Sequence, residues 1–127
     1  MANTKSTKHT PNKHHTGQRG ETAAAAYLQA NGYTIVGMNW RCKVGEIDII
    51  ARAADGLYVF VEVRTRESID TAFESVTPHK REKMIRAAYA YADIHPDADE
   101  NWRIDVIAVV LTLDQPIIQH VQDALDW

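Results

Sequence analysis

Residues 45–66 have the sequence Gly-Glu-Ile-Asp-Ile-Ile-Ala-Arg-Ala-Ala-Asp-Gly-Leu-Tyr-Val-Phe-Val-Glu-Val-Arg-Thr-Arg, which is two apolar runs separated by a polar dipeptide. Ile and Val are frequent in both runs, as is typical of β-strands. The dipeptide is Asp55-Gly56, which favours a tight hairpin because both residues tolerate positive φ. The sequence therefore predicts two antiparallel strands joined at this turn.

Charged side chains lie on one face of each predicted strand. Because side chains alternate along a strand, residues two positions apart share a face. The charged faces carry Glu46, Asp48 and Ile50 on the first strand and Phe60, Glu62, Arg64 and Arg66 on the second, whereas the opposite faces carry Ile47, Ile49, Val59, Val61 and Val63. The simplest interpretation is a sheet with one face in water.

Glu62 favours a different interpretation, in which the charged face is a binding site. The large side chains of Phe60, Val61 and Val63 would desolvate its carboxylate unless a cation or hydrogen-bond donors compensate. Asp48 and Glu62, on neighbouring strands, would supply the oxygen ligands that a hard divalent ion needs, and such an ion stabilises the negative charge on an attacked phosphate. This pattern predicts a metal site for phosphoryl chemistry, with the solvated face as the alternative.

Length and composition limit the class of protein. The chain has 127 residues, 45% of them hydrophobic, which is enough for one domain with a core. The single Cys42 cannot form an internal disulfide, as expected in a reducing compartment. No run is long enough to span a membrane and the N-terminus lacks a secretory apolar segment, so a cytoplasmic protein without a membrane partner is predicted. The formal net charge of -3 means that any nucleic-acid binding must rest on a local basic patch.

The chain is predicted to divide into a disordered basic arm, residues 1–16, and a single domain, residues 17–127. The arm is polar and aperiodic, and it carries Lys5, Lys8 and Lys13 without an acidic residue. Because these cations lie in the arm, the domain itself is more acidic than the whole chain.

Two helices are predicted from local signals. An Ala-rich helix over Gln18–Asn31 is expected to end at Gly32, a residue suited to a left-handed C-terminal stop. A second helix begins with Thr77 as its N-cap and Pro78 at its first position, and it ends at His95-Pro96-Asp97.

Three more strands complete the expected fold. They are predicted over Tyr33–Trp40, over Asn101–Leu113 and around Ile117 to Val121, with an irregular loop after Arg66. The strand over 101–113 is almost continuously aliphatic, as is typical of a strand buried on both faces. Because a helix separates it from the hairpin, a parallel crossover and hence a mixed sheet are predicted.

Basic side chains follow the predicted metal site in the sequence. Arg64 and Arg66 end the second hairpin strand, and the opening turns of the second helix carry Lys80, Arg81, Lys83 and Arg86. Such a run is commonly a solvated face, but Arg and Lys at a helix N-terminus also hold phosphate. Both interpretations remain open at this point.

Glu21 and Asp105 each have a structural and a functional interpretation. Glu21 lies in the first turn of the first predicted helix, where it either interacts with the helix dipole or reaches toward Asp48 and Glu62. Asp105 shares a face of the long strand with Arg103. A structural ion pair, either between them or between Arg103 and an acid of a neighbouring strand, is preferred to a catalytic role.

The order of these elements, with an acid on the second strand and Glu-x-cation on the third, resembles the restriction-endonuclease-like core that carries the PD-(D/E)XK nuclease motif. More closely, the chain resembles the YraN-like family of bacterial endonuclease-like proteins from Gly17 to about Ala124. The matching blocks are Gly17-x-x-Gly20-Glu21, Gly32-Tyr33, Gly45-Glu46-Ile47-Asp48-Ile49-Ile50-Ala51, Phe60-Val61-Glu62-Val63-Arg64-x-Arg66, Val76 with Lys80, and Arg103-Ile104-Asp105-Val106. The resemblance implies an α/β fold of three layers with a mixed central sheet, in the order α-β-β-β-α-β-β.

The resemblance also implies a metal-dependent phosphodiesterase acting on nucleic acid. Asp48 and Glu62 would be the ligands of Mg²⁺ or Mn²⁺, and Glu21 matches the position of a helix-borne Glu that joins them in related junction-resolving nucleases. Where the nuclease motif has Lys, this chain has Arg64, which can hold a phosphate but cannot release a proton to activate water. Either Lys80 supplies an amine, or a metal-bound water suffices, or the site binds without cutting.

The expected function is therefore an endonuclease for DNA, in preference to RNA, with a structured or branched substrate as one option. The expected catalytic residues are Asp48, Glu62, Arg64, Lys80 and Glu21, and the expected nucleic-acid-binding residues are Arg64, Arg66, Lys80 and Arg81. The alternatives are a non-catalytic nucleic-acid-binding or adaptor module and a protein-interaction domain with structural carboxylates. Homodimerisation is left open by the sequence.

Overall fold

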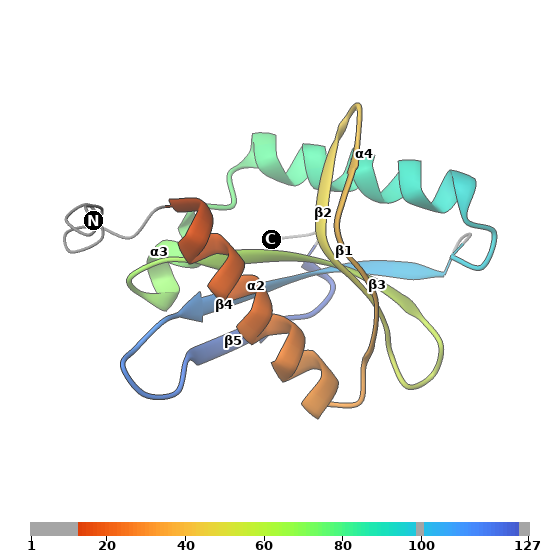
Figure 1. Ribbon diagram of the computed structural model, residues 1–127. Coiled ribbons are helices and arrows are strands. Elements are labelled where there is room, and N and C mark those ends of the chain that lie inside the picture. Colours follow the sequence, from red (N-terminus) through yellow and green to blue (C-terminus); the bar gives the residue numbers. More distant parts are fainter. Residues whose placement is uncertain (1–12, 99–100, 125–127) are drawn as a thin grey trace, which may run out of the picture.

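The computed structural model describes residues 13–98 and 101–124, which form a five-stranded mixed sheet with helices on both faces (Figure 1). The helices are α2 (Lys13–Ala30), α3 (Ile69–Glu74) and α4 (Pro78–Ile94), and the strands are β1 (Thr34–Cys42), β2 (Gly45–Arg52), β3 (Tyr58–Thr65), β4 (Trp102–Val110) and β5 (Ile117–Val121). This order is the expected one with α3 added. None of the described helices is long and apolar enough to cross a membrane.

The strands lie in the sheet in the same order as in the chain. β2 and β3 pair antiparallel, as predicted, and Gly56 in the turn between them has a φ of 92°, in the left-handed region that favours glycine. β3 and β4 pair in parallel with α3 and α4 in the connection, so the predicted crossover and mixed sheet are confirmed.

The two long helices cover opposite faces of the sheet (Figure 1). On one face, Leu28 of α2 packs against residues of β2, β3 and β4 that include Val61. On the other, Met84 and Tyr91 of α4 pack around Phe60. β4 contributes buried residues to both clusters, as expected for a strand covered on two sides. The predicted α/β fold of three layers is therefore confirmed.

The helix boundaries follow the predicted signals at most ends. α4 begins after the N-cap Thr77 with Pro78 as its first residue, and its C-cap is His95. α2 begins at Lys13 rather than at Gln18, so the last residues assigned to the disordered arm are helical. The rest of that arm lies outside the described residues.

The segment expected to be an irregular loop after Arg66 contains the short helix α3. Ser68 caps its N-terminus, with its Oγ accepting a hydrogen bond from the Thr71 N–H at 3.1 Å. Ala72 is the residue that α3 buries. A helix of 6 residues is too short to show an apolar period, so the N-cap serine was the one available signal.

The predicted alternation of side chains fails along β2. Ile47 packs with Ile50 on the α4 face, whereas Ile49 packs on the α2 face, so Ile47 and Ile49 do not share one aliphatic face as expected. The break falls at Asp48. It coincides with the end of the β2–β3 pairing, which stops at Ile49 opposite Val61. On the N-terminal side of Ile49, β2 separates from β3. The sheet therefore opens at the carboxylates of Asp48 and Glu62.

Candidate active site

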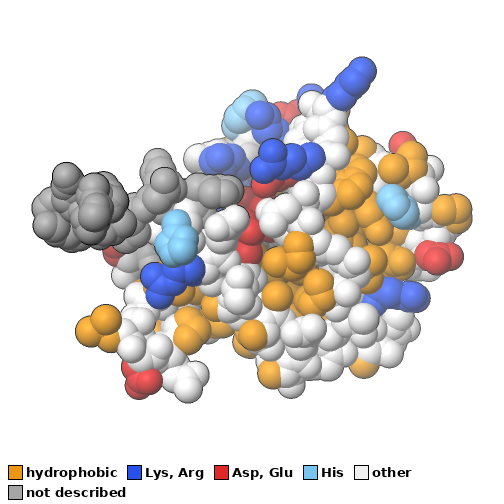
Figure 2. All heavy atoms as spheres, viewed as in Figure 1, with side chains coloured by type: hydrophobic (Ala, Val, Ile, Leu, Met, Phe, Trp, Pro, Cys, Tyr) orange, Lys and Arg blue, Asp and Glu red, His pale blue; other side chains and the backbone are white. Residues whose placement is uncertain are grey.

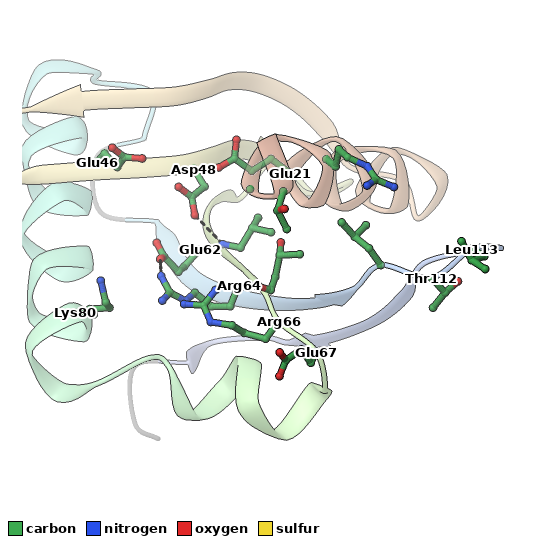
Figure 3. Close-up of a pocket in the computed structure, with 16 residues that line it drawn as sticks. Glu21, Glu46, Asp48, Glu62, Arg64, Arg66, Glu67, Lys80, Thr112 and Leu113 are labelled. Carbon is green, nitrogen blue, oxygen red and sulfur yellow. Dashed lines mark hydrogen bonds and ion pairs between the residues drawn. The ribbon is translucent and has the colours of Figure 1, made fainter. Parts of the chain in front are cut away.

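A pocket lies where β2 and β3 separate, and all three layers of the fold contribute to it (Figure 3). Its volume is about 1050 Å³. The lining includes Glu21 of α2, Glu46 and Asp48 of β2, Glu62, Arg64 and Arg66 of β3, and Lys80 of α4. Figure 2 shows acidic side chains recessed in the surface with Lys and Arg side chains beside them. The fold thus brings together six of the seven side chains that the sequence singled out.

Asp48 is buried, with 6% of its surface exposed, and its side chain bridges the opening between the strands. Its Oδ2 accepts a hydrogen bond from the Val63 N–H at 2.8 Å. In a continuous antiparallel ladder a backbone carbonyl would accept such a bond. The Asp48 carboxylate therefore accepts the hydrogen bond of a β3 backbone N–H at the point where the β2 backbone no longer pairs with β3. This hydrogen bond fixes Asp48 at the floor of the pocket.

Arg64 holds the Glu62 carboxylate in place. Its Nη1 donates to Glu62 Oε2 at 3.0 Å, and its Nε donates to Ser75 Oγ at 2.8 Å. Ser75 Oγ in turn donates to the Ala72 carbonyl at 2.6 Å, at the end of α3. The side chains of Arg64 and Glu62 are only 12% and 14% exposed, so solvent screens this pair weakly. α3, which the sequence did not predict, thus anchors one of the predicted site residues.

The pocket does not balance the charge of its two central carboxylates. Burial, and then the neighbouring Glu62, raise the pKa of Asp48 to about 8. Burial also raises the pKa of Glu62, although Arg64 and Lys80 act in the opposite direction. The charge of these two buried carboxylates is therefore only partly offset by Arg64 and Lys80.

Glu21 reaches this site because α2 packs very closely on β3. A Cβ atom added to Gly20 would lie 3.0 Å from Thr65 Cβ and still closer to Thr65 Oγ1, so only glycine allows this approach. The negative charge of Glu21 contributes to the raised pKa of Asp48. Of its two predicted roles, the structure therefore supports the one in which Glu21 approaches Asp48, as Figure 3 also shows.

The predicted phosphate-binding cations divide into two groups. Lys80 and Arg66 line the pocket with Arg64, and burial followed by repulsion from Arg64 lowers the pKa of Arg66. An anion placed between these cations would relieve that repulsion. Arg81 is not among the residues that line the pocket, and its Nε is buried without a hydrogen-bond partner among the described residues. The structure therefore does not place Arg81 with the other three.

The donor set of the pocket fits a hard divalent cation. Mg²⁺ is usually held by one or two carboxylates and keeps several waters, and Asp48 with Glu62 supply those carboxylates. The raised pKa values mean that burial disfavours the charged forms of both acids, and a divalent ion would offset that cost. Among the described residues, no three His, Cys, Asp or Glu side chains are grouped closely enough to form a complete protein cage. The remaining ligand positions would therefore be left to water and substrate.

Sequence reasoning missed several residues that line the pocket or hold its side chains in place. Arg19 on α2, Ser75 after α3 and the segment Leu111–Leu113 after β4 were not predicted as site residues. For Leu111–Leu113 a signal was available, because the ends of parallel strands β3 and β4 meet at one edge of the sheet. Arg19 and Ser75 give no such signal, since their positions depend on how α2 and α3 pack.

Asp105 on β4 is a second buried acid, on a different part of the sheet, and it lies in a hydrogen-bonded cluster. Arg103 Nε donates to Asp105 Oδ1 at 2.9 Å, and His120 Nε2 contacts Oδ2 at 2.7 Å. The Asp123 N–H donates to Oδ1 at 3.0 Å. Tyr27 OH lies 3.1 Å from His120 Nδ1, which ties α2 to β5. The predicted ion pair between Arg103 and Asp105 is confirmed, and its contacts are those of a structural cluster.

The chain is an α/β protein with a mixed sheet between two helical layers, and acids on its second and third strands lie at a pocket where the sheet opens. This is the arrangement that the resemblance to the restriction-endonuclease-like core predicted. The family model described as uncharacterised protein family UPF0102 matches residues 20–109. The chain belongs to this YraN-like family.

Relatives share most of the chain's length. A UPF0102 protein of Chloroflexus aurantiacus is 50% identical over 98 residues, covering 76% of this chain and 80% of that protein. A UPF0102 protein of Roseiflexus castenholzii is 44% identical over 116 residues, covering 87% of this chain and 92% of that protein. Among solved structures, a repair endonuclease from Pyrococcus abyssi aligns with a TM-score of 0.49 and 20% identity, over 73% of this chain and 39% of that chain.

Proposed function

We propose that this protein is a Mg²⁺- or Mn²⁺-dependent endonuclease that hydrolyses phosphodiester bonds in DNA. The observation that carries the proposal is the buried pair Asp48 and Glu62, which the fold holds together without balancing its charge. Two adjacent carboxylates whose pKa values are both raised are costly for the fold. A divalent cation offsets that cost, and Arg64, Arg66 and Lys80 then surround the place where a phosphate would lie.

Each residue has a distinct role in this proposal. Asp48 and Glu62 would hold the ion, which when bound stabilises charge on the phosphate and makes its bound water more acidic. Arg64 positions the Glu62 carboxylate through the contact at 3.0 Å. Arg66 and Lys80 would orient the phosphate. Lys80 is also the one lysine among the described residues that line the pocket, so its amine, once it has lost its own proton to solvent, is our candidate for the group that takes a proton from water.

One observation favours a second function, which is nucleic-acid binding without hydrolysis. Arg64 occupies the position where the nuclease motif has Lys, and its guanidinium is engaged by Glu62 and Ser75. A guanidinium cannot exchange a proton near neutral pH, so the catalytic proposal depends on Lys80 or on metal-bound water. In the binding-module alternative, Arg66 and Lys80 hold phosphates and no bond is broken.

The test is cleavage of single-stranded, duplex and branched DNA by the full chain with Mg²⁺ or Mn²⁺. Asp48→Asn and Glu62→Gln keep the size of each side chain and remove its charge, so each is expected to lower the cleavage rate at least about 100-fold. Asp55→Asn, the same change at the far turn of the β2–β3 hairpin, should leave the rate unchanged.

Circular dichroism must show that all three variants are folded. If the folded wild-type protein leaves every substrate intact with both metals, the hydrolytic proposal is wrong. Binding that weakens steeply with salt but produces no cleavage would instead support the binding module.

A further inference from the structure

The β1–β2 hairpin extends past the sheet as a two-stranded ribbon beside the pocket, residues 40–47. Within it Trp40 pairs with Ile47, Arg41 with Glu46 and Cys42 with Gly45, whereas the pairing of β2 with β3 ends at Ile49. Figure 1 shows the ribbon projecting across α4 beyond the rest of the sheet. Glu46 belongs both to the ribbon and to the pocket lining, so the ribbon starts at the edge of the candidate active site.

The ribbon is braced against α4 and therefore has a fixed direction. The Trp40 ring packs edge-on against Tyr91 of α4 with 5.2 Å between ring centroids. At the turn, a Cβ atom added to Gly45 would lie 3.3 Å from the Lys83 carbonyl oxygen, so glycine allows the ribbon to rest directly on the helix backbone. Ile47 is buried in the same core as α4. A hairpin held in this way is a rigid projection rather than a loose loop.

Apart from Glu46, whose carboxylate forms an ion pair with Arg41 at 3.4 Å, the exposed side chains of the ribbon are basic and apolar. The Arg41 side chain is 73% exposed, Lys43 is exposed, and Val44 at the turn is 41% exposed. Lys80 and Lys83, on the helix that the ribbon crosses, are also exposed. In Figure 2 Lys and Arg side chains gather over the ribbon tip and the first turns of α4, above the recessed acids. This concentration of positive charge occurs in a chain whose formal net charge is -3.

We propose that the ribbon enters the major groove of duplex DNA and positions the duplex so that a phosphate reaches the pocket. The inference rests on the proposed function, because it names the substrate of the same site. The major groove of B-form DNA is about 12 Å wide and admits a two-stranded β-ribbon. Arg41 and Lys43 then contact phosphates at the groove edges, and Val44 faces the bases. The deep and narrow major groove of an RNA duplex excludes the ribbon.

The experiment measures binding and cleavage separately. Fluorescence anisotropy of the full chain in EDTA, which prevents metal-dependent turnover, is recorded with a DNA duplex, an RNA duplex of the same sequence and the single DNA strand. Lys43→Glu is expected to weaken binding of the DNA duplex about 10-fold and to reduce its salt dependence by about one phosphate contact, with little effect on the other two ligands.

The matched control is Arg52→Glu, which makes the same charge change at the opposite end of β2. Arg52 is exposed, and among the described residues its guanidinium contacts the Gly56 carbonyl and the Tyr58 ring, so the variant should fold and should bind the DNA duplex like the wild type. Thermal unfolding of both variants checks this. An equal loss of affinity for the DNA duplex in Lys43→Glu and Arg52→Glu would show a general charge effect and would overturn the inference.

The remaining outcomes distinguish failure of the ribbon proposal from failure of the hydrolytic proposal. If Lys43→Glu binds the DNA duplex as the wild type does, or loses the single strand equally, the ribbon proposal is wrong even when cleavage with Mg²⁺ is intact. If the wild type binds the duplex through Lys43 but cuts nothing with Mg²⁺ or Mn²⁺, the ribbon proposal stands and the hydrolytic one fails. A wild-type protein that binds none of the three ligands overturns the ribbon proposal, and cleavage with Mg²⁺ or Mn²⁺ then decides the hydrolytic one separately.

Discussion

Asp48 on β2 and Asp105 on β4 are both buried in the sheet, but their surroundings shift the pKa values of the two carboxyl groups in opposite directions. Burial alone would raise the pKa of Asp105, yet hydrogen bonds from His120, Arg103 and the Asp123 N–H outweigh it and lower that pKa. Asp48 accepts one backbone hydrogen bond and faces a second acid, and its pKa rises to about 8. The hydrogen bonds of Asp105 favour its charged form in the fold, whereas the charged form of Asp48 is costly, which is why we propose a cation site at Asp48 and not at Asp105.

The largest expected difference between the two clusters is in stability. Asp105→Asn is expected to lower the free energy of unfolding by about 3 kcal/mol, because Arg103 is left beside a neutral amide in a largely buried position. Asp48→Asn should leave that free energy unchanged or raise it, because it removes a charge that the fold disfavours. Urea unfolding of both variants at pH 7 in EDTA measures the two values. Equal losses in both variants would contradict the distinction.

The same two variants should differ in their pH dependence. The folded-state pKa of Asp105 lies below its ordinary value of 3.8, so its contribution to stability is present above about pH 4 and is lost as the pH falls further. The raised pKa of Asp48 has the opposite sign: its contribution is complete below 3.8 and is lost as the pH rises through about 8. In a plot of unfolding free energy against pH, Asp105→Asn should reduce the loss of stability below about pH 4. Asp48→Asn should reduce the loss of stability between pH 3.8 and about pH 8.

A divalent cation should stabilise one cluster and not the other. Free Mn²⁺ at 100 times its Kd is expected to raise the free energy of unfolding by about 2.7 kcal/mol through binding to the folded state alone. This stabilisation by Mn²⁺ should disappear in Asp48→Asn. It should persist in Asp105→Asn, although that variant is less stable without metal, and excess EDTA should reverse it. Calorimetric unfolding with and without the metal gives the comparison. A gain that survives Asp48→Asn would place the ion elsewhere.

Local sequence signals predicted the parts of the fold that depend on neighbouring residues. Thr77-Pro78 predicted the start of α4, and Asp55-Gly56 predicted the β2–β3 hairpin. The order of elements then predicted that β3 and β4 are parallel. Asp48 and Glu62 could be placed together because both lie near one end of the same predicted hairpin.

What the sequence did not reveal depends on contacts between distant segments. The break in alternation at Asp48 arises where β2 leaves β3 and bends over α4, and the residues of β2 remain apolar on either side of it. Arg64 finds its second partner in Ser75, which α3 positions. Arg81 follows Lys80 in a basic run, but α4 presents only Lys80 to the pocket. Periodicity cannot distinguish two neighbouring cations on a helix until its neighbours are known.

The smallest expected effect concerns how α2 brings Glu21 to the uncompensated cluster. Gly20→Ala places a methyl group against Thr65, so overpacking is expected to cost about 2 kcal/mol and to move Glu21 away from Asp48. Gly17→Ala is the matched control, because nothing lies within 4 Å of its added Cβ and the change should stabilise α2 by up to about 1 kcal/mol. Chemical unfolding with and without Mn²⁺ separates the overpacking from the displacement of Glu21. Gly20→Ala should lower the free energy of unfolding without metal, and it should also reduce the increase in that free energy that Mn²⁺ produces. If Gly20→Ala keeps the full gain, the pair Asp48 and Glu62 binds the ion without help from the close approach of α2, and Glu21 has no part in the site.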